Sequence, residues 1–303
     1  MAKSLLLRGY RAVDASRILV GAHCSMMMAD MGADVIKIEQ RGTGDETRHW
    51  GPPFRGPSEQ QRDATYFMSV NRNKRSMTVD MKHPDGKQIV KDLLSRSDIF
   101  MENFMPSKIR KLQLDYDSVK EINPSLVYAS VAGFPQDSEW ADKAAFDLTI
   151  QAMCGFMHIT GEADGTPQKV GYAITDVLAG QQLFSGVLAA IMHLERTGGQ
   201  GKGQGQHIQT SLLESSIYAL NYVTSSWLMG GYDYTRKGNT HPLISPYTVF
   251  KTRDGEYLVI GVATDAQFKT FTKVLRAEHL SVDPRFLTNR VRCENNSALY
   301  TEL

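Results

Sequence analysis

The feature that most constrains the fold is the alternation of short apolar segments with helical patterns along the first 133 residues. Residues 11–15, 33–39, 77–80, 98–104 and 126–133 have the pattern of strands. Residues 18–31 between them have the pattern of a helix, and residues 83–97 that of an amphipathic helix. Strands joined by helices form parallel sheets that are covered on both faces. The sequence therefore predicts an α/β fold, with a Rossmann-like large domain and a mostly parallel sheet.

The pattern changes after residue 230. A helical run at residues 178–194, a strand at 207–212 and a helix to 230 complete the first part. Residues 248–262 then predict a hairpin that turns at Asp254-Gly255, and helices are expected at 265–276 and from 289 onward. The last helical pattern still runs at Leu303 without a cap. We expect a large domain at residues 1–230 and, at 231–303, the start of a smaller α+β domain that is incomplete.

Composition excludes some functions. The 34 Lys and Arg residues balance 33 Asp and Glu residues, so no overall charge attracts nucleic acid or an anionic membrane. The three cysteines are far apart and form no CxxC motif, which predicts neither disulfides nor a metal site and favours a reducing compartment. No uninterrupted apolar run reaches the roughly 18 residues of a membrane span. Residues 1–11 are basic and free of acid, a faint sign of a presequence, but the first predicted strand follows at once.

Asp176 is the strongest candidate for a catalytic residue. It precedes a long helical pattern that is almost free of charge. A carboxylate at this point is either a helix N-cap or a reactive group, and we favour a covalent nucleophile. A second candidate feature is the positive cluster of Arg72, Lys74 and Arg75, which suits phosphate binding but equally a solvated turn. His158 is a lone histidine and is expected to be structural.

Several motifs, in order, resemble the class III CoA-transferases. This family includes formyl-CoA transferase, carnitine CoA-transferase and the α-methylacyl-CoA racemases. The motifs are Ala-Asp-Val-Ile-Lys-Ile-Glu at 33–39, Asn-Arg-Asn-Lys-Arg-Ser at 71–76, Glu-Asn-Phe at 102–104, Asp147, Gln-Ala at 151–152 and Ile-Thr-Asp at 174–176. Residues 45–54, 69–76 and 157–161 look most similar to the succinyl-CoA:glutarate (hydroxymethylglutarate) CoA-transferase branch.

The resemblance implies an enzyme that moves coenzyme A from an acyl-CoA, such as succinyl-CoA, to a carboxylic or dicarboxylic acid. Asp176 would form a mixed anhydride and then an aspartyl-CoA thioester. Phe146 and Asp147 would lie beside the substrate, and Gly238 and Asn239 would belong to a mobile loop that covers the intermediate. No permanent cofactor is implied, because the CoA thioester is a substrate. The implied coenzyme A contacts are Ile18, Leu19, Val20, Gln40, Arg41, Val79, Lys82, Asn103, Phe104, Met105 and Lys111.

Some positions depart from the family pattern. Lys111 and Gln40 stand where arginines are expected, although Arg41 is adjacent to Gln40. Racemases of the family have a histidine at the position of Phe146, which has no proton to transfer, so a racemase is the second hypothesis. A truncated CoA-binding homologue without activity is the third. The resemblance further implies an interlocked homodimer and a mitochondrial location, or a cytoplasmic one if there is no presequence.

Overall fold

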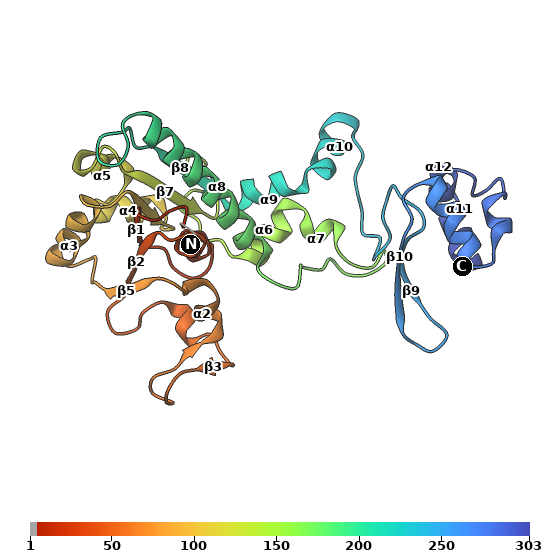
Figure 1. The fold of residues 1–303 in the computed structure, drawn as a ribbon, viewed down its shortest axis with the longest axis horizontal. Coiled ribbons are helices and arrows are strands. Elements are labelled where there is room, and N and C mark those ends of the chain that lie inside the picture. Colours follow the sequence, from red (N-terminus) through yellow and green to blue (C-terminus); the bar gives the residue numbers. More distant parts are fainter. Residues whose placement is uncertain (1–4) are drawn as a thin grey trace. The chain divides into compact units, whose positions relative to one another are not determined.

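The computed structural model describes residues 5–303, so the first four residues of the basic N-terminal stretch lie outside the described part. The chain forms two compact units (Figure 1). The first contains the residues up to Cys154 together with Gly171–Asn221, and the second contains Gly155–Val170 and Tyr222–Leu303. The expected division into residues 1–230 and 231–303 stays a prediction.

The first unit is built around a six-stranded sheet with the order β5-β2-β1-β6-β7-β8 (Figure 1). Every neighbouring pair is parallel, which confirms the predicted α/β class with a parallel sheet. The strands are β1 (Arg11–Asp14), β2 (Asp34–Glu39), β5 (Arg75–Thr78), β6 (Ile99–Glu102), β7 (Val127–Ala132) and β8 (His207–Ser211). Since all six run the same way, their carboxyl ends lie along one edge of the sheet.

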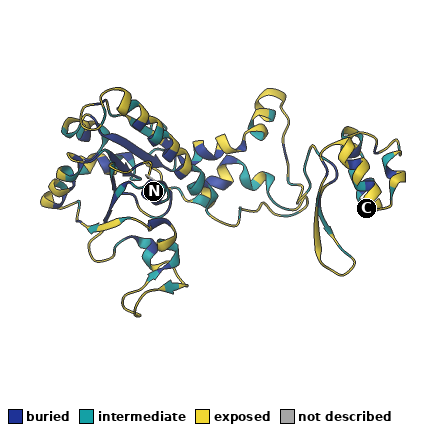
Figure 2. Ribbon diagram, in the orientation of Figure 1, coloured by how far each residue is buried: buried dark blue, intermediate teal, exposed yellow. Residues whose placement is uncertain are grey.

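Helices cover both faces of this sheet, and the strands are mostly dark blue in Figure 2 because they are buried on both sides. On one face α1 (Val20–Asp30) and α8 (Ile174–Arg196) pack against alternate strand residues such as Val35 and Ala129. On the other face α3 (Pro84–Leu94), α4 (Pro106–Leu112) and α5 (Tyr116–Ile122) pack against residues such as Phe100. The sheet is the centre of both cores. The remaining elements of this unit are η1 (Glu46–His49), β3 (Phe54–Arg55), β4 (Asp63–Ala64), α2 (Thr65–Asn71), α6 (Asp147–Cys154) and α9 (Leu212–Leu220).

Helix α8 corrects two expectations. It begins at Ile174 rather than at residue 178, so Asp176 lies inside the helix instead of before it. It is also, within residues 5–303, the single helix long and apolar enough to cross a membrane, whereas no such run was expected. Apolar side chains on one of its faces, including Leu183 and Val187, are buried in the core of the first unit, whereas Met192 is exposed. A helix that packs in the core of this unit accounts for the length and the apolar composition of α8.

The second unit has its own small core. It contains the antiparallel hairpin of β9 (Tyr247–Lys251) and β10 (Tyr257–Gly261), which turns at Gly255 as predicted. Phe268, Phe286 and Leu299 are buried together in its C-terminal part. The helical segment at 147–159 is divided at Gly155, whose φ of 100° is left-handed, and its second half belongs to this unit. The helices are α7 (Phe156–Ile159), α10 (Tyr222–Gly230), α11 (Asp265–Val274), η2 (Glu278–Ser281), α12 (Asn289–Glu294) and α13 (Asn296–Glu302).

Candidate active site

Asp176 lies in the first turn of α8. The N-cap position belongs to Ala173, which has no side-chain cap, so the alternative of Asp176 as an N-cap is wrong. Burial, followed by the charge of Asp147, raises the pKa of the Asp176 carboxyl to about 7. A carboxylate in the first turn also meets the positive end of the helix dipole. This turn therefore holds a partly buried carboxyl that titrates near neutrality.

Asp147, at the start of α6, holds the start of α8 in place. Its Oδ1 accepts hydrogen bonds from the backbone N–H and from the hydroxyl of Thr175, both at 2.9 Å. Its Oδ2 accepts a hydrogen bond of 2.6 Å from the amide of Gln151. Two carboxyl groups from different helices thus lie close to each other in the first unit.

An apolar cluster with an aromatic ring lies next to the start of α8. Ile18, Tyr66 and Ala173 pack against one cluster of buried residues that includes Leu19. Burial and the charges of Asp176 and Asp147 raise the pKa of the Tyr66 hydroxyl, which places this ring in the electrostatic field of both carboxylates. Trp50 packs edge-on against Tyr66, with ring centroids 5.4 Å apart. An apolar environment of this kind keeps a carboxylate poorly solvated and reactive.

Helix α1 approaches α8 one turn beyond Asp176. A Cβ added to Gly180 would lie 2.8 Å from the carbonyl oxygen of Val20 and 3.1 Å from the ring of His23. Glycine at this position therefore lets the backbone of α1 reach α8. The β1–α1 connection and the turn that carries Asp176 are held together as a consequence.

Two buried ion pairs lie under the β1–α1 connection. Lys74 bonds to Asp14 at 3.2 Å, and Lys37 bonds to Asp45 at 3.0 Å. All four side chains are almost completely buried. Burial opposes ionisation of Asp14, but Lys74 and Lys37 outweigh it and hold the pKa of that carboxyl well below its usual range. Lys74 also donates to the carbonyl of Ala22, which links the pair to the first turn of α1.

The predicted phosphate-binding cluster is already paired with acids. Arg72 bonds to Asp30 and Arg75 bonds to Asp34, while Lys74 is buried. Arg72 and Arg75 are therefore ion-paired while their side chains stay more than half exposed, whereas Lys74 is part of the buried core. A role of this cluster in phosphate binding stays a prediction.

The fold gathers the predicted coenzyme A contacts from distant parts of the sequence. They follow four strands, β1, β2, β5 and β6, which are neighbours in the sheet and end at the same edge. Gln40, Arg41, Lys82 and Lys111 are exposed, as groups that meet phosphates need to be. The predicted contacts at this edge are Ile18, Leu19 and Val20 after β1, Gln40 and Arg41 after β2, Val79 and Lys82 after β5, and Asn103, Phe104 and Met105 after β6. Lys111 lies in the last turn of α4.

The remaining predicted site residues fall in both units. Phe146 is 70% exposed and immediately precedes α6, beside Asp147. Gly238 and Asn239 belong to the second unit, where Gly238 is left-handed with a φ of 56° and its N–H donates to the carbonyl of Gly161. Their expected role as a cover for Asp176 stays a prediction.

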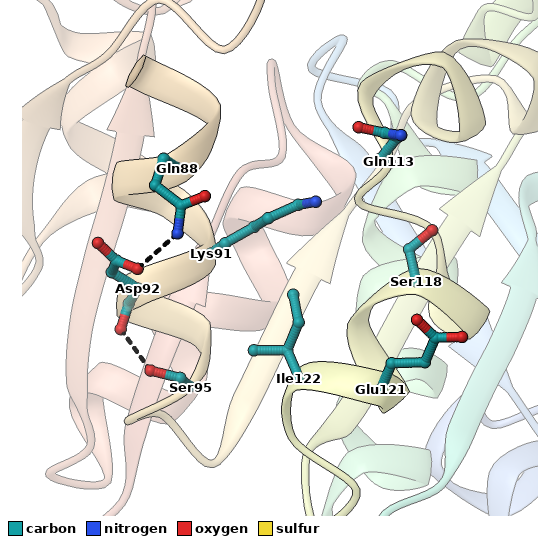
Figure 3. Close-up of a pocket in the computed structure, with 8 residues that line it drawn as sticks. All are labelled: Gln88, Lys91, Asp92, Ser95, Gln113, Ser118, Glu121 and Ile122. Carbon is teal, nitrogen blue, oxygen red and sulfur yellow. Dashed lines mark hydrogen bonds between the residues drawn. The ribbon is translucent and has the colours of Figure 1, made fainter. Parts of the chain in front are cut away.

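One groove in the first unit is separate from all of these residues. It has a volume of about 400 Å³ and lies between α3 and α5 (Figure 3). Its lining is mostly polar, and Gln88 donates a hydrogen bond of 2.8 Å to Asp92 across one turn of α3. No predicted site residue lines it. In residues 5–303, no group of three or more His, Cys, Asp or Glu side chains is placed to hold a metal ion.

Sequence reasoning missed the buried polar residues at this edge. Lys37 and Asp14 each interrupt an apolar strand, and this is the signal that could have identified them. Glu102 ends β6 and is 1% exposed, with a backbone N–H of Phe104 donating to it at 2.7 Å. Burial raises the pKa of the Glu102 carboxyl to about 8. Tyr66 could not have been found from the sequence, because only the fold brings it near Asp176.

Open parallel sheets bind ligands in the crevice outside the carboxyl ends of their strands. The family model described as CoA-transferase family III matches residues 7–303. The succinyl-CoA:glutarate CoA-transferase of Mus musculus is 39% identical over 97% of this chain and 65% of its own length. The succinate–glutarate CoA-transferase of Agrobacterium fabrum is 40% identical over 94% of this chain and 70% of its own length.

A solved structure agrees with these comparisons. The crystal structure of a CAIB/BAIF family protein from Brucella suis superimposes with a TM-score of 0.85 at 38% identity, over 98% of this chain and 76% of that one. The chain belongs to CoA-transferase family III. It spans about two thirds of the length of the curated relatives it matches.

Proposed function

We propose that the chain transfers coenzyme A from an acyl-CoA, with succinyl-CoA as the first choice of donor, to a carboxylic or dicarboxylic acid. Membership of the family supports the reaction class. Two relatives named for succinyl-CoA or succinate together with glutarate support the substrate class. The reaction exchanges one thioester for another of similar free energy, so it needs a nucleophile and a site without water more than it needs a source of energy.

The observation that carries the proposal is the partly buried Asp176 carboxyl, whose pKa is raised to about 7. A more basic carboxylate attacks a thioester more readily, and near neutral pH a useful fraction of it is ionised. Its position in the first turn of α8 adds helix N–H groups that favour negative charge nearby. Tyr66 and Leu19 provide the apolar surroundings that exclude water.

The proposed reaction has four balanced steps. The Asp176 carboxylate attacks the donor thioester carbonyl, and the C–S bond breaks to give an acyl-aspartyl anhydride and CoA thiolate. The thiolate attacks the aspartyl carbonyl, which releases the donor acid and leaves an aspartyl-CoA thioester. The acceptor carboxylate attacks this thioester and expels the CoA thiolate, which leaves a second anhydride between Asp176 and the acceptor acid. The thiolate then attacks the acceptor's carbonyl carbon in that anhydride. Product acyl-CoA leaves, and the Asp176 carboxylate is regenerated.

The remaining parts of the proposal concern binding. The residues that follow β1, β2, β5 and β6 would hold coenzyme A along the sheet edge, and Gly238 with Asn239 would cover the intermediate. We also propose a homodimer and a mitochondrial location. Racemization is not favoured, because Phe146, which stands where a racemase needs a proton carrier, has an inert ring.

Replacement of Asp176 tests the function. We expect Asp176→Asn to lower the rate of coenzyme A transfer from succinyl-CoA to glutarate by at least about 10³-fold, because the amide is not a nucleophile. Coenzyme A binding, measured by calorimetry, should change little. Asp92→Asn on α3 is the control and should retain transfer. Undiminished transfer in Asp176→Asn would contradict the proposal, and binding without transfer in the unaltered chain would favour a non-catalytic homologue.

A further inference from the structure

The β1–α1 connection contains an unusual backbone conformation. Ile18 has a φ of 67°, in the left-handed region. A β-branched side chain strongly disfavours this region, so surrounding contacts must impose it. Leu19, the next residue, is helical and serves as the N-cap position of α1. The conformation of Ile18 therefore sets the direction in which α1 leaves the sheet.

Two side chains hold the backbone at Ile18 and at the residue before it. The Asn103 Oδ1 accepts from the Arg17 N–H at 2.9 Å, and the Asn103 Nδ2 donates to the Arg17 carbonyl at 2.8 Å. Asn103 thus pairs with Arg17 as a strand residue would. The Asp45 Oδ2 accepts from the Ile18 N–H at 3.2 Å. Asp45 is 3% exposed and fixed by Lys37.

The Arg17 side chain contacts the same two segments as the backbone of this connection, one after β2 and one after β6. Its guanidinium bonds to Glu46 at 3.1 Å and lies over the ring of Phe104, 5.3 Å from the centroid. One side of the connection is therefore bound to the segment after β2, and the other to the segment after β6. The Lys37 ammonium adds a bond of 2.9 Å to the carbonyl of Ser16.

Residues 17–20 contact residues that lie before and after Asp176 in the sequence. Ile18 packs against the same apolar cluster as Ala173, the residue before α8. The Val20 carbonyl lies against Gly180, one turn beyond Asp176. A displacement of Ile18 would therefore disturb the packing at Ala173 and Gly180, on either side of Asp176 in the sequence.

We propose that Asn103 and Asp45 are positioning residues, which hold Ile18 in the left-handed conformation and so place Leu19 and Val20 against the catalytic turn of α8. This rests on the proposed function and assigns the Asn103 side chain to Arg17 rather than to coenzyme A. Both polar atoms of that side chain are engaged by the Arg17 backbone. Asp45 is engaged by Ile18, Lys37 and Thr47.

A matched pair of asparagine variants tests the proposal. Asn123 makes the same kind of side-chain bonds, to the carbonyls of Leu94 and Ser97. It follows α5 and contacts the residues that precede β6, so it lies at the amino end of the strands. We expect Asn103→Ala to lower kcat/KM for succinyl-CoA about 10- to 100-fold, as misplacement of a reacting group does. Asn123→Ala should leave kcat/KM within about twofold of the unaltered chain while it costs similar stability.

A double-mutant cycle with Ile18→Gly gives the decisive readout. Glycine adopts the left-handed region without strain, so the Asn103→Ala loss should be smaller in the Ile18→Gly background than in the unaltered chain. Equal losses in both backgrounds, or equal losses from Asn103→Ala and Asn123→Ala, would overturn the proposal. An Asp45→Asn variant, which keeps one acceptor oxygen, should lose less activity than Asp45→Ala.

Hydrogen exchange separates this proposal from the proposed function. Asn103→Ala should speed the exchange of the amides of residues 17–20, and Asn123→Ala should not. Unchanged exchange in Asn103→Ala would refute the positioning role even in an active transferase. If Asn103→Ala exchanges faster but the unaltered chain transfers no coenzyme A, Asn103 does hold residues 17–20 in place. Its role in catalysis would then be refuted together with the proposed function.

Discussion

Asp147 accepts two hydrogen bonds from Thr175, at 2.9 Å from its backbone N–H and 2.9 Å from its hydroxyl. This contact fixes the start of α6 to the first turn of α8. It also keeps a negative charge near Asp176, where it is the second cause, after burial, of the raised pKa of that carboxyl. The same side chain thus positions the candidate nucleophile and tunes its basicity.

Replacement of Asp147 should shift the pH profile of the reaction. Asp176 must be ionised to attack, so kcat/KM should rise with pH around a midpoint near 7. Asp147→Asn keeps an acceptor oxygen for Thr175 but removes the charge, so the pKa of Asp176 should fall and the acid limb should move to lower pH. Burial remains, so the midpoint should stay above the ordinary value for aspartate. A midpoint that moves upward, or one that moves equally in the Asp92→Asn control, would contradict this reading.

The buried Glu102 should make stability depend on pH. Burial raises the pKa of its carboxyl from 4.5 to about 8 in the folded state. Between these values the unfolded chain has released the proton and the folded chain has kept it, so stability falls as pH rises, by up to about 1.4 kcal/mol per pH unit. Glu102→Gln retains an acceptor for the Phe104 N–H and removes the ionisation.

Urea unfolding of both proteins at pH 5 and pH 8 measures this effect. The stability of Glu102→Gln relative to the unaltered chain should increase from pH 5 to pH 8. Glu121→Gln on α5, at a groove on the surface, is the control and should show no such trend. A pH-independent difference between Glu102→Gln and the unaltered chain would show that this carboxyl ionises normally.

The sheet could be predicted from the sequence, but the side-chain contacts at its edge could not. Strands such as β7 were predictable because nearly continuous apolar runs are buried on both faces, and Asp176 was predictable because it stands alone before an apolar helical pattern. The start of α8 was placed four residues late, since the segment before it has no N-cap residue.

The conformation of Ile18 and the buried ion pairs could not be predicted from the sequence. Nothing local marks Ile18 as left-handed, because its side chain disfavours that conformation and the contacts next to it come from Asn103 and Asp45, which are far away in the sequence. Lys74 and Asp14 are 60 residues apart in the chain, and only the order of the strands brings them together. Long-range polar pairs of this kind depend on the whole fold.

The Lys74–Asp14 pair should be essential for stability. Lys74→Met removes the cation and leaves Asp14 buried without it, which should lower the free energy of unfolding by about 3–5 kcal/mol. The double variant Lys74→Met with Asp14→Asn removes both charges, so it should lose less than the sum of the single losses. Chemical denaturation of the three variants measures the coupling. Arg75→Met breaks an exposed pair with Asp34 and, as the control, should cost no more than about 1 kcal/mol.

The two glycines of α8 should respond differently to alanine. In Gly180→Ala the new Cβ would lie 2.8 Å from the Val20 carbonyl oxygen, and a backbone atom cannot yield without moving α1. This overpacking should cost about 1–3 kcal/mol and exceed the gain in helix propensity. In Gly186→Ala the new Cβ would meet only the side chain of Ile208, at 2.7 Å.

The contact in Gly186→Ala is with a side-chain methyl group rather than with backbone, so a small shift of Ile208 relieves part of it. Together with the gain in helix propensity of about 1 kcal/mol, this should leave Gly186→Ala less destabilised than Gly180→Ala. Transfer activity should fall in Gly180→Ala, because the shift of α1 moves Leu19 relative to Asp176, and should persist in Gly186→Ala. Thermal unfolding and succinyl-CoA kinetics on both variants provide the comparison. If Gly180→Ala were as stable and as active as Gly186→Ala, the close packing of α1 against α8 at Gly180 would not be needed for stability or for transfer.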